Sequence, residues 1–554
     1  MVRKIIYITL LILIAIGNKN RINAQTPLTY DQKYAILKEV FDNVFMSMGV
    51  VDAPPELLLD DKRSSSVAYL KRNKDGSKTL AVEDKAFDIC MTFGDRSKEA
   101  LALLIGHELG HFRYNHQWGK DFSSSFALAD IEDKLAEANT KLSELKYFET
   151  QADHSGGVSC YLAGYDISGL GEPLLKKIYT EYELPSESPK YPSLKDRISL
   201  SQQNDSIIGK LIRVFETGNY AMLVGEYGEA IKCFEFVLNK GFKSREMYNN
   251  LGACALLKAI GLIGKEKVKY VYPVEIDVES RIKDAHKGFS DEAKGLLTKA
   301  KDYFKIAVQL DKNYSTGYIN LACAHSLDGE LEDGKYNASK ALKILSANNN
   351  DPTYLANANI VMAILLDQES KTNDAKNLLS DIIKVSPNYL AEVNLEIIKG
   401  KKAEDFTWAK KMTKERLKNI KLQKDTSTIG NPARKETIAG INDFMKDLEG
   451  QELDEIEMNK SSCYYLDYKN SEIYNLTTTD NHELYFQETT PNYIGQTSQG
   501  ITFQNAQNKI IAAYGLPDVV YTSRGENIFI YKSINLMIKL CGEKVSGWIV
   551  YRRY

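Results

Sequence analysis

Apolar residues recur at helical spacing through most of the first 400 residues of the chain. In the stretch that begins at Ser97, the positions on one side of the predicted helix are Leu101, Leu104, Ile105, Leu109 and Phe112. Because residues three and four apart share a helix face, this side is expected to be buried. Ser97 is a suitable N-cap residue, and Glu99 in the first turn suits the positive end of the helix dipole.

Strand-like patterns precede this helix. Residues 66–70 and 79–82 have the composition of strands around a turn at Asp75-Gly76, and residues 86–91 lead into the helix. A strand that borders a cleft can pair with the backbone of an extended substrate, but the sequence does not say which strand would do so. The region up to residue 205 is therefore predicted to be a mainly helical α+β domain.

Residues 211–400 carry a repeated helical pattern. Gly218 and Gly252 are 34 residues apart, a period typical of stacked helix pairs. The residues that recur around these glycines are Ala230, Phe234, Leu238, Tyr248, Leu251, Ala300, Phe304, Ala307, Tyr318, Leu321 and Ala322. Small residues let paired helices approach, and stacked pairs bury a continuous core. A generic helical bundle is the alternative interpretation.

An insertion near residues 261–293 interrupts the repeats and contains Tyr270-Val271-Tyr272-Pro273-Val274. Its aromatic side chains have two interpretations, a binding edge or packing against neighbouring helices. Residues 401–434 are rich in lysine and polar residues, and they predict a last helix and a linker. Gly430-Asn431-Pro432 marks the break that follows.

After residue 434 the pattern becomes strand-like. The predicted strands are 463–468, 471–476, 483–487, 519–522, 527–532, 534–540 and 547–552, with a helix at 505–514. This pattern predicts a small α+β accessory domain that serves for packing or docking. Cys463 and Cys541 are a candidate disulfide in it, although seven cysteines in 554 residues are not a disulfide scaffold. The cysteines predicted to be buried in helices are Cys160, Cys233, Cys254 and Cys323.

The first residues have the pattern of a secretory signal. Arg3 and Lys4 precede an apolar run over residues 5–16, and Ala24-Gln25 is a suitable cleavage point. The apolar run is short for a membrane span, although an uncleaved anchor remains the alternative. The sequence therefore predicts a signal peptide at residues 1–24, no integral membrane span after its removal, and a periplasmic or secreted protein.

The composition is that of an ordinary globular protein. Hydrophobic residues make up 43% and charged residues 26%, and the length indicates three or four domains. The formal net charge of -3 gives no reason to expect nucleic acid or an anionic membrane surface as a partner.

The candidate chemistry lies in His107-Glu108-Leu109-Gly110-His111 on the helix described first. Two histidines four residues apart leave the same helix face about one turn from each other, as two nitrogen ligands of one tetrahedral zinc require. Glu108 lies about 100° around the helix from His107 and is placed to accept a proton from water. An accidental match within a surface or core helix is the alternative interpretation.

A catalytic zinc needs a third protein ligand and an open position for water. Glu149 and Asp153 begin another apolar-periodic stretch, one turn apart and on one face. Glu149 is predicted to be the third ligand. Asp153 is predicted to accept a ring N–H from a zinc histidine and thereby to select its tautomer. One Zn²⁺ per chain is the expected cofactor.

These motifs, with Ala163-Gly164-Tyr165-Asp166, resemble the M48 metallopeptidases, which are gluzincins, over about residues 28–200. The resemblance implies an endopeptidase with His107, His111 and Glu149 on zinc and Glu108 as the base. Family members often carry His-Pro and then Arg after the third ligand, whereas this chain has Tyr191-Pro192 and then Arg197. A tyrosine at position 191 can donate a hydrogen bond to an oxyanion, so Tyr191 is a further catalytic candidate.

The repeats resemble the tetratricopeptide repeat family, which implies a concave surface for a peptide or an envelope protein partner. A peptidase domain joined to such repeats resembles periplasmic quality-control proteases. The alternative is a binding scaffold or chaperone with a vestigial peptidase domain, and the residues that argue against decay are His107, Glu108, His111, Glu149 and Asp153.

The predicted architecture is multidomain. It joins a zincin-like metallopeptidase domain, an all-α tetratricopeptide superhelix and the small α+β domain. The expected segments are 1–24 for the signal peptide, 25–205 for the peptidase domain, 206–400 for the repeats, 401–434 for the helix and linker, and 435–554 for the accessory domain. The expected function is hydrolysis of peptide bonds in exported protein substrates, with the repeats recruiting or restraining the substrate.

Overall fold

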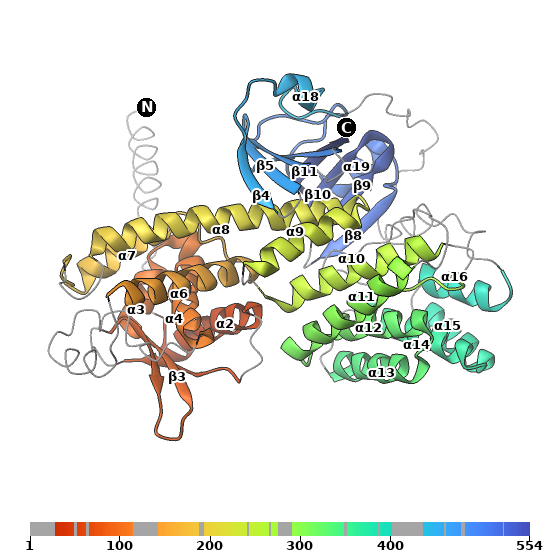
Figure 1. The fold of residues 1–554 in the computed structure, drawn as a ribbon, viewed down its shortest axis with the longest axis horizontal. Coiled ribbons are helices and arrows are strands. Elements are labelled where there is room, and N and C mark those ends of the chain that lie inside the picture. Colours follow the sequence, from red (N-terminus) through yellow and green to blue (C-terminus); the bar gives the residue numbers. More distant parts are fainter. Residues whose placement is uncertain are drawn as a thin grey trace, which may run out of the picture.

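The computed structural model shows a multidomain, mostly helical chain with a separate β-sheet region (Figure 1). It describes residues 28–48, 53–61, 66–114, 142–187, 193–240, 243–264, 268–274, 291–347, 352–385, 388–401, 436–458, 461–477, 482–523 and 526–554. The predicted signal peptide, Tyr191 and nearly all of the predicted linker lie outside these residues. Among the described helices, none combines the length and apolarity that crossing a bilayer requires.

The N-terminal part packs helices around a small sheet. Its elements are α2 (Tyr30–Ser47), β1 (Glu56–Asp60), β2 (Ala68–Arg72), β3 (Lys78–Glu83), α3 (Asp84–Met91), the 3-10 turn η1 (Gly94–Arg96), α4 (Ser97–Arg113), α6 (Leu142–Leu162) and α7 (Gly171–Glu181). The strand order is β1-β3-β2, with β1 parallel and β2 antiparallel to β3. The two predicted strands are present as β2 and β3. Strand β1 was not predicted, because Leu57, Leu58 and Leu59 are consecutive apolar residues without strand alternation.

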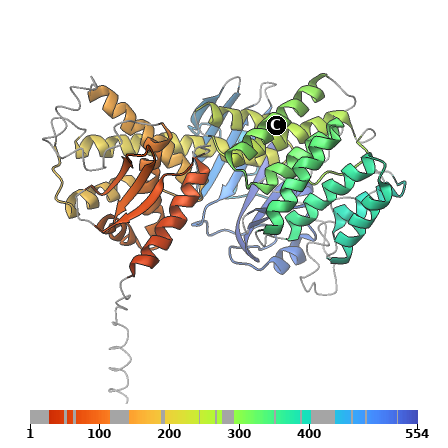
Figure 2. The ribbon, with the colours of Figure 1, turned by 90° about the horizontal axis from the view of Figure 1, so that it is seen from below.

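Helix α8 (Leu194–Leu223) connects the three parts of the structure. It contacts α6 and α7 on the N-terminal side, α9 of the helical array, and β5 and β6 of the large sheet. The predicted boundary at residue 206 falls inside this continuous helix. The N-terminal part and the array lie at the two ends of the molecule (Figures 1 and 2).

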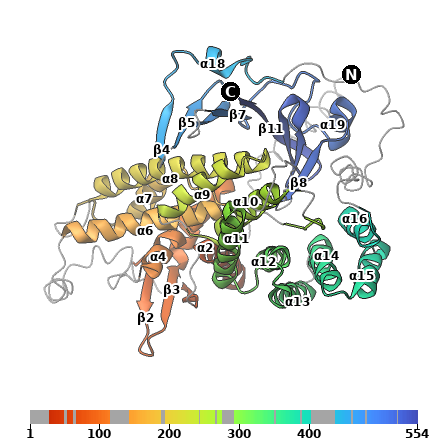
Figure 3. The ribbon, with the colours of Figure 1, turned by 45° about the vertical axis from the view of Figure 1, so that its right-hand side comes forward.

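The array is a stack of helix pairs. Figure 3 shows its last helices nearly end-on. After α8 it contains α9 (Tyr227–Asn239), α10 (Arg245–Ile263), α11 (Asp291–Leu310), α12 (Ser315–Asp328), α13 (Leu331–Ala347), α14 (Pro352–Gln368), α15 (Thr372–Val385) and α16 (Tyr389–Ile398). The two glycines that set the repeat period make equivalent contacts. A Cβ on Gly218 would meet Phe234 of α9, and a Cβ on Gly252 would meet Phe304 of α11, both at under 3.0 Å. Glycine therefore allows the close approach within each pair.

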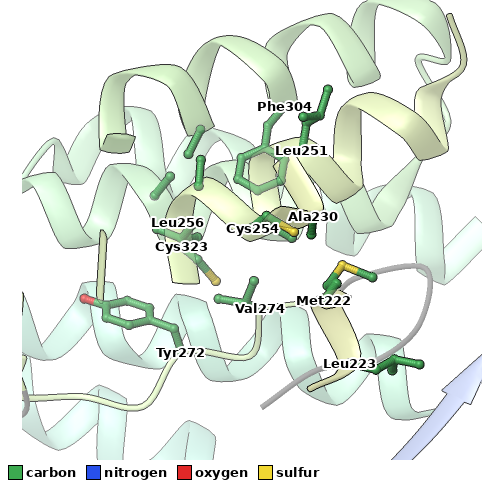
Figure 4. Packing of buried hydrophobic residues seen from close by; sticks show 14 of the residues in the cluster. Met222, Leu223, Ala230, Leu251, Cys254, Leu256, Tyr272, Val274, Phe304 and Cys323 are labelled. Atoms are coloured by element: carbon green, nitrogen blue, oxygen red, sulfur yellow. The ribbon is translucent and has the colours of Figure 1, made fainter. Parts of the chain in front are cut away.

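One continuous core runs through the array (Figure 4). The four cysteines predicted to be buried small hydrophobes are buried. Tyr272 and Val274 of the insertion lie beside Cys254, Leu256 and Cys323 in this core. Of the two interpretations of the insertion aromatics, the structure therefore shows packing against helices.

The C-terminal region is an eight-stranded sheet with the order β4-β5-β6-β7-β11-β10-β9-β8. Its elements are α18 (Phe444–Asp447), β4 (Asp454–Met458), β5 (Ser461–Asp467), β6 (Ser471–Thr477), β7 (Glu483–Thr489), α19 (Gln507–Tyr514), β8 (Val519–Ser523), β9 (Glu526–Tyr531), the 3-10 turn η3 (Lys532–Ile534), β10 (Leu536–Cys541) and β11 (Lys544–Arg553). Strand β4 was not predicted. The candidate disulfide is wrong, because Cys463 on β5 and Cys541 on β10 are both free and three strands separate them in the sheet.

A cluster of carboxylates and tyrosines joins α6, α8 and the large sheet. Glu216 accepts hydrogen bonds from the hydroxyls of Tyr161 at 2.8 Å and Tyr474 at 3.0 Å. Glu488 lies nearby, where it accepts hydrogen bonds from Tyr220 and from Lys539. Burial and the charge of Glu488 raise the pKa of Glu216 to about 7. Glu216 therefore keeps its proton to a higher pH in the folded protein than in the unfolded chain.

This pKa predicts a pH-dependent stability. The stabilisation due to Glu216 is complete below pH 4.5 and is lost as the pH rises through about 7. Between pH 5 and pH 8 the free energy of unfolding of the wild type should fall by about 2 kcal/mol more than that of Glu216→Gln, because a glutamine side chain cannot ionise. Urea unfolding at both pH values measures this difference. Glu235→Gln is the matched control, because Glu235 also accepts a tyrosine hydrogen bond, from Tyr303 at 3.0 Å. Equal pH slopes in wild type and Glu216→Gln would contradict the assignment.

Candidate metal centre

Helix α4 presents His107 and His111 towards α6, and both side chains are buried. The imidazole rings are 4.7 Å apart between centroids and nearly perpendicular. The predicted N-cap role of Ser97 is wrong. Ser97 is the first helical residue after the 3-10 turn η1, and its hydroxyl donates backwards to the carbonyls of Met91 and Gly94.

Glu149 on α6 completes a group of three possible metal ligands with the two histidines. The Nε2 atoms of His107 and His111 are 3.2 Å apart, and the Glu149 carboxylate oxygens lie 3.4 Å from the first and 3.6 Å from the second. Zinc bonds of about 2.0–2.2 Å at tetrahedral angles separate donor atoms by roughly 3.3–3.6 Å. The three donors therefore fit one small tetrahedral cation. The predicted ligand residues are brought together by the fold.

Asp153 also lies where the sequence predicted it. Its Oδ1 is 2.6 Å from Nδ1 of His107, so it accepts the proton carried by that nitrogen. This hydrogen bond selects the tautomer in which Nε2 carries a lone pair directed at the other two ligands. Asp153 therefore orients the ring of His107 and is not one of the three possible ligands.

Charges around the histidines favour a cation at this position. Burial alone would lower the pKa of His107, but the carboxylates of Asp153, Glu149 and Glu108 raise it to about 9. Burial would raise the pKa of Glu149, whereas His111, His107 and Arg197 together lower it. The imidazole is thus held in a negative environment that stabilises either a proton or a metal ion.

Arg197 was not predicted to be part of the site, but it lies beside Glu149 in the structure. Its guanidinium lies 3.8 Å from Oε2 of Glu149. Burial would lower the pKa of Arg197, but Tyr179, Glu149 and Asp153 together raise it. The signal that could have found it is its place after Pro192 in the motif of the resembled family. Together with His111 and His107, Arg197 therefore favours the ionised form of Glu149.

Glu108 is buried on α4 between the two histidine ligands, at 2% exposure. Its charge adds to those of Asp153 and Glu149 in raising the pKa of His107. Tyr191 lies outside the described residues, so its predicted contact with an oxyanion remains a prediction. The structure therefore positions five of the six predicted site residues.

Close glycine contacts between α4 and α6 determine the distance between the ligands. A Cβ on Gly156 would lie 2.2 Å from the carbonyl oxygen of Gly106, and a Cβ on Gly110 would lie 2.4 Å from that of Ala152. These are backbone atoms, which cannot move aside as a flexible side chain does. The absence of side chains at these positions lets Glu149 reach the histidines.

Gly156→Ala should therefore destabilise the protein by about 1–3 kcal/mol and weaken metal binding, because the helices must separate. The control is Gly209→Ala on α8, where no atom lies within 4 Å of the added Cβ. Alanine there should stabilise the helix by about 0.5–1 kcal/mol. Thermal unfolding and metal titration of both variants provide the comparison. A stabilised Gly156→Ala variant with full metal affinity would contradict the contact.

Asp153→Ala should lower metal affinity by about 10–100-fold, because His107 loses the group that orients its ring. Asp153→Asn keeps an oxygen acceptor at the same position, so its loss should be smaller. Competition with a chelator of known affinity measures both variants. Equal affinities in Asp153→Ala and wild type would show that the ring is held by other contacts.

A second group of possible metal ligands contains His325, Glu330 and Asp333. In this group, Lys301 already neutralises the carboxylate of Glu330. The Lys301 ammonium donates to both oxygens of Glu330 at 2.9 Å, and that hydrogen bond, with His325, lowers the pKa of Glu330. A metal ion would have to displace this ammonium. The first group is therefore the better candidate for a metal.

Comparison of the sequence with protein-family models and with curated proteins finds no match. The function is therefore inferred from the arrangement of the side chains in the candidate metal centre.

Proposed function

We propose that this protein is an exported zinc metalloendopeptidase. The observation that carries the proposal is the spacing of the three donor groups: the two histidine Nε2 atoms are 3.2 Å apart, and each has a Glu149 carboxylate oxygen at 3.4 or 3.6 Å. Two histidines and one glutamate form a ligand set typical of hydrolytic zinc sites, in which the fourth position is left to water or substrate. The location of Asp153 and Glu108 supports the same function.

Bound zinc would supply a Lewis acid that lowers the pKa of water and polarises a peptide carbonyl. Glu108 acts as the general base that accepts the proton of the attacking water and delivers it to the leaving nitrogen. Asp153 keeps the proton of His107 on Nδ1 while this happens. Arg197 adds to the effect of His111 and His107 in lowering the pKa of Glu149.

The surrounding elements support a zincin-like domain joined to a tetratricopeptide-like array. Within the described N-terminal sheet, β2 is an edge strand and contacts α4. Its main chain can add an extended substrate as a further strand beside the metal helix. The pairs from α8 to α15 support the repeat interpretation, and the first two of them share an equivalent glycine–phenylalanine contact.

Cleavage of an unfolded reporter protein tests the proposal. The zinc-loaded mature protein should cut the reporter, and removal of zinc by a chelator should stop the cleavage. Returning one equivalent of zinc should restore it. If the zinc-loaded protein binds the reporter without cutting it, the scaffold or chaperone function is supported instead.

A further inference from the structure

Residues 268–274 cross the helical array as a non-helical segment. Its alternate side chains are buried at 4–8% exposure, and these are Val268, Tyr270, Tyr272 and Val274. Lys269 and Val271 between them are exposed and half-buried, respectively, and the alternation ends at Pro273, which is buried. This alternation is typical of an extended chain that lies on a surface. We name residues 268–274 the internal segment.

The internal segment lies on one layer of the array. Helices α10, α12, α14 and α16 contact one another in that order, and α11, α13 and α15 form the second layer. The groups that hydrogen-bond to the internal segment come from the first layer. They are Ser326 on α12, Asp367 on α14 and Asn394 on α16. The segment therefore runs across successive helices of that layer.

Asn394 recognises the main chain of the internal segment. Its Oδ1 accepts a hydrogen bond from the Val271 N–H at 3.0 Å, and its Nδ2 donates to the Val271 carbonyl at 2.9 Å. The same Nδ2 donates to the Leu390 carbonyl at 2.9 Å, which fixes the orientation of the amide. Any residue except proline offers both main-chain groups, so this contact is independent of sequence.

Asp367 and Ser326 recognise side chains. The Oδ2 atom of Asp367 accepts hydrogen bonds from the Tyr270 hydroxyl and from the Lys269 ammonium, both at 2.7 Å. The Tyr272 hydroxyl lies 3.3 Å from the hydroxyl of Ser326. Val274 lies in the hydrophobic core beside Cys323 (Figure 4). These contacts select a basic residue followed by two aromatic residues at alternate positions.

We propose that this layer is a binding groove for extended polypeptide segments with aromatic side chains at alternate positions, and that the internal segment occupies the groove as a tethered competitor. The internal segment belongs to no described helix or strand, so its departure breaks no secondary structure. A tethered competitor acts at an effective concentration in the millimolar range and weakens the apparent affinity of external ligands. The proposal concerns binding alone and does not depend on the peptidase reaction.

A fluorescent peptide with the sequence of residues 266–276 is the probe, and its binding to the full mature chain is measured by fluorescence anisotropy. Tyr270→Phe with Tyr272→Phe removes the two hydroxyl contacts of the internal segment and leaves its apolar packing. Asp367 keeps Lys269 and Thr372 as partners, so the double variant should fold. We expect the double variant to bind the probe at least tenfold more tightly than the wild type.

Asn394→Ala in the double variant removes the main-chain contact that the probe needs, so the probe should bind more weakly than it does to the double variant alone. The matched control is Asn320→Ala in the same background, because Asn320 is also buried in the array and donates to Asn249 at 2.9 Å. This control should keep the affinity of the double variant. The proposal is overturned if the folded double variant binds the probe no better than the wild type. It is also overturned if a peptide of the same composition in scrambled order binds equally well.

Discussion

Glu108→Gln is expected to lower peptide cleavage by about 10²–10⁴-fold, the usual cost of losing a general base. Glutamine has nearly the same shape as glutamate but cannot accept the proton of the attacking water. Glu108 is not one of the three residues that could hold the metal. The variant should therefore keep its metal and its fold. Metal analysis and single-turnover cleavage of an unfolded reporter measure the two properties separately.

Glu99→Gln is the matched control for this experiment, because Glu99 lies in the first turn of the same helix. Its cleavage rate should equal that of the wild type. If Glu108→Gln cleaves as fast as the wild type, Glu108 is not the base. A Glu108→Gln variant that has lost its metal would instead give Glu108 a role in metal binding.

His111→Ala is expected to reduce zinc to well below one equivalent per chain and to abolish cleavage with it. Two protein donors remain, and they cannot hold zinc in the tetrahedral arrangement that the three donors provide. Metal analysis of the purified variant after dialysis measures the zinc content.

His325→Ala is the matched control, because His325 is the buried histidine of the second possible ligand group. Since Lys301 already neutralises Glu330, we expect this variant to keep its single zinc. Full zinc content in a His107→Ala, His111→Ala double variant would refute the first site. Loss of zinc in His325→Ala would place the metal in the array.

Local geometry explains why the histidine pair could be predicted from the sequence. Residues four apart on any α-helix lie about one turn from each other, whatever the rest of the chain does. The apolar positions from Leu101 to Phe112 predicted that helix, and α4 spans Ser97–Arg113. The cap at Ser97 was wrong, because the 3-10 turn η1 precedes the helix and directs the hydroxyl backwards.

The repeat period also carried tertiary information. Gly218 and Gly252 were selected only by their separation of 34 residues, and each allows the close approach of a phenylalanine from the paired helix. Because these two helix pairs make the same close contact, a glycine recurs at the same position of each repeat. By contrast, the order of the strands in the large sheet corresponds to no periodic pattern in the sequence. The separation of Cys463 and Cys541 in the sheet could therefore not be predicted, and the disulfide prediction was wrong.

The sequence alone determined the residues that a metal would need, because side-chain chemistry and helix spacing are local properties. Only the tertiary structure decided their distances. Glu149 is 38 positions from His111, and its approach depends on glycine contacts between α4 and α6 that no periodicity describes. The tertiary structure also decided that Val271 faces Asn394, 123 residues away. Such pairings depend on how helices pack, and packing is determined by the whole chain at once.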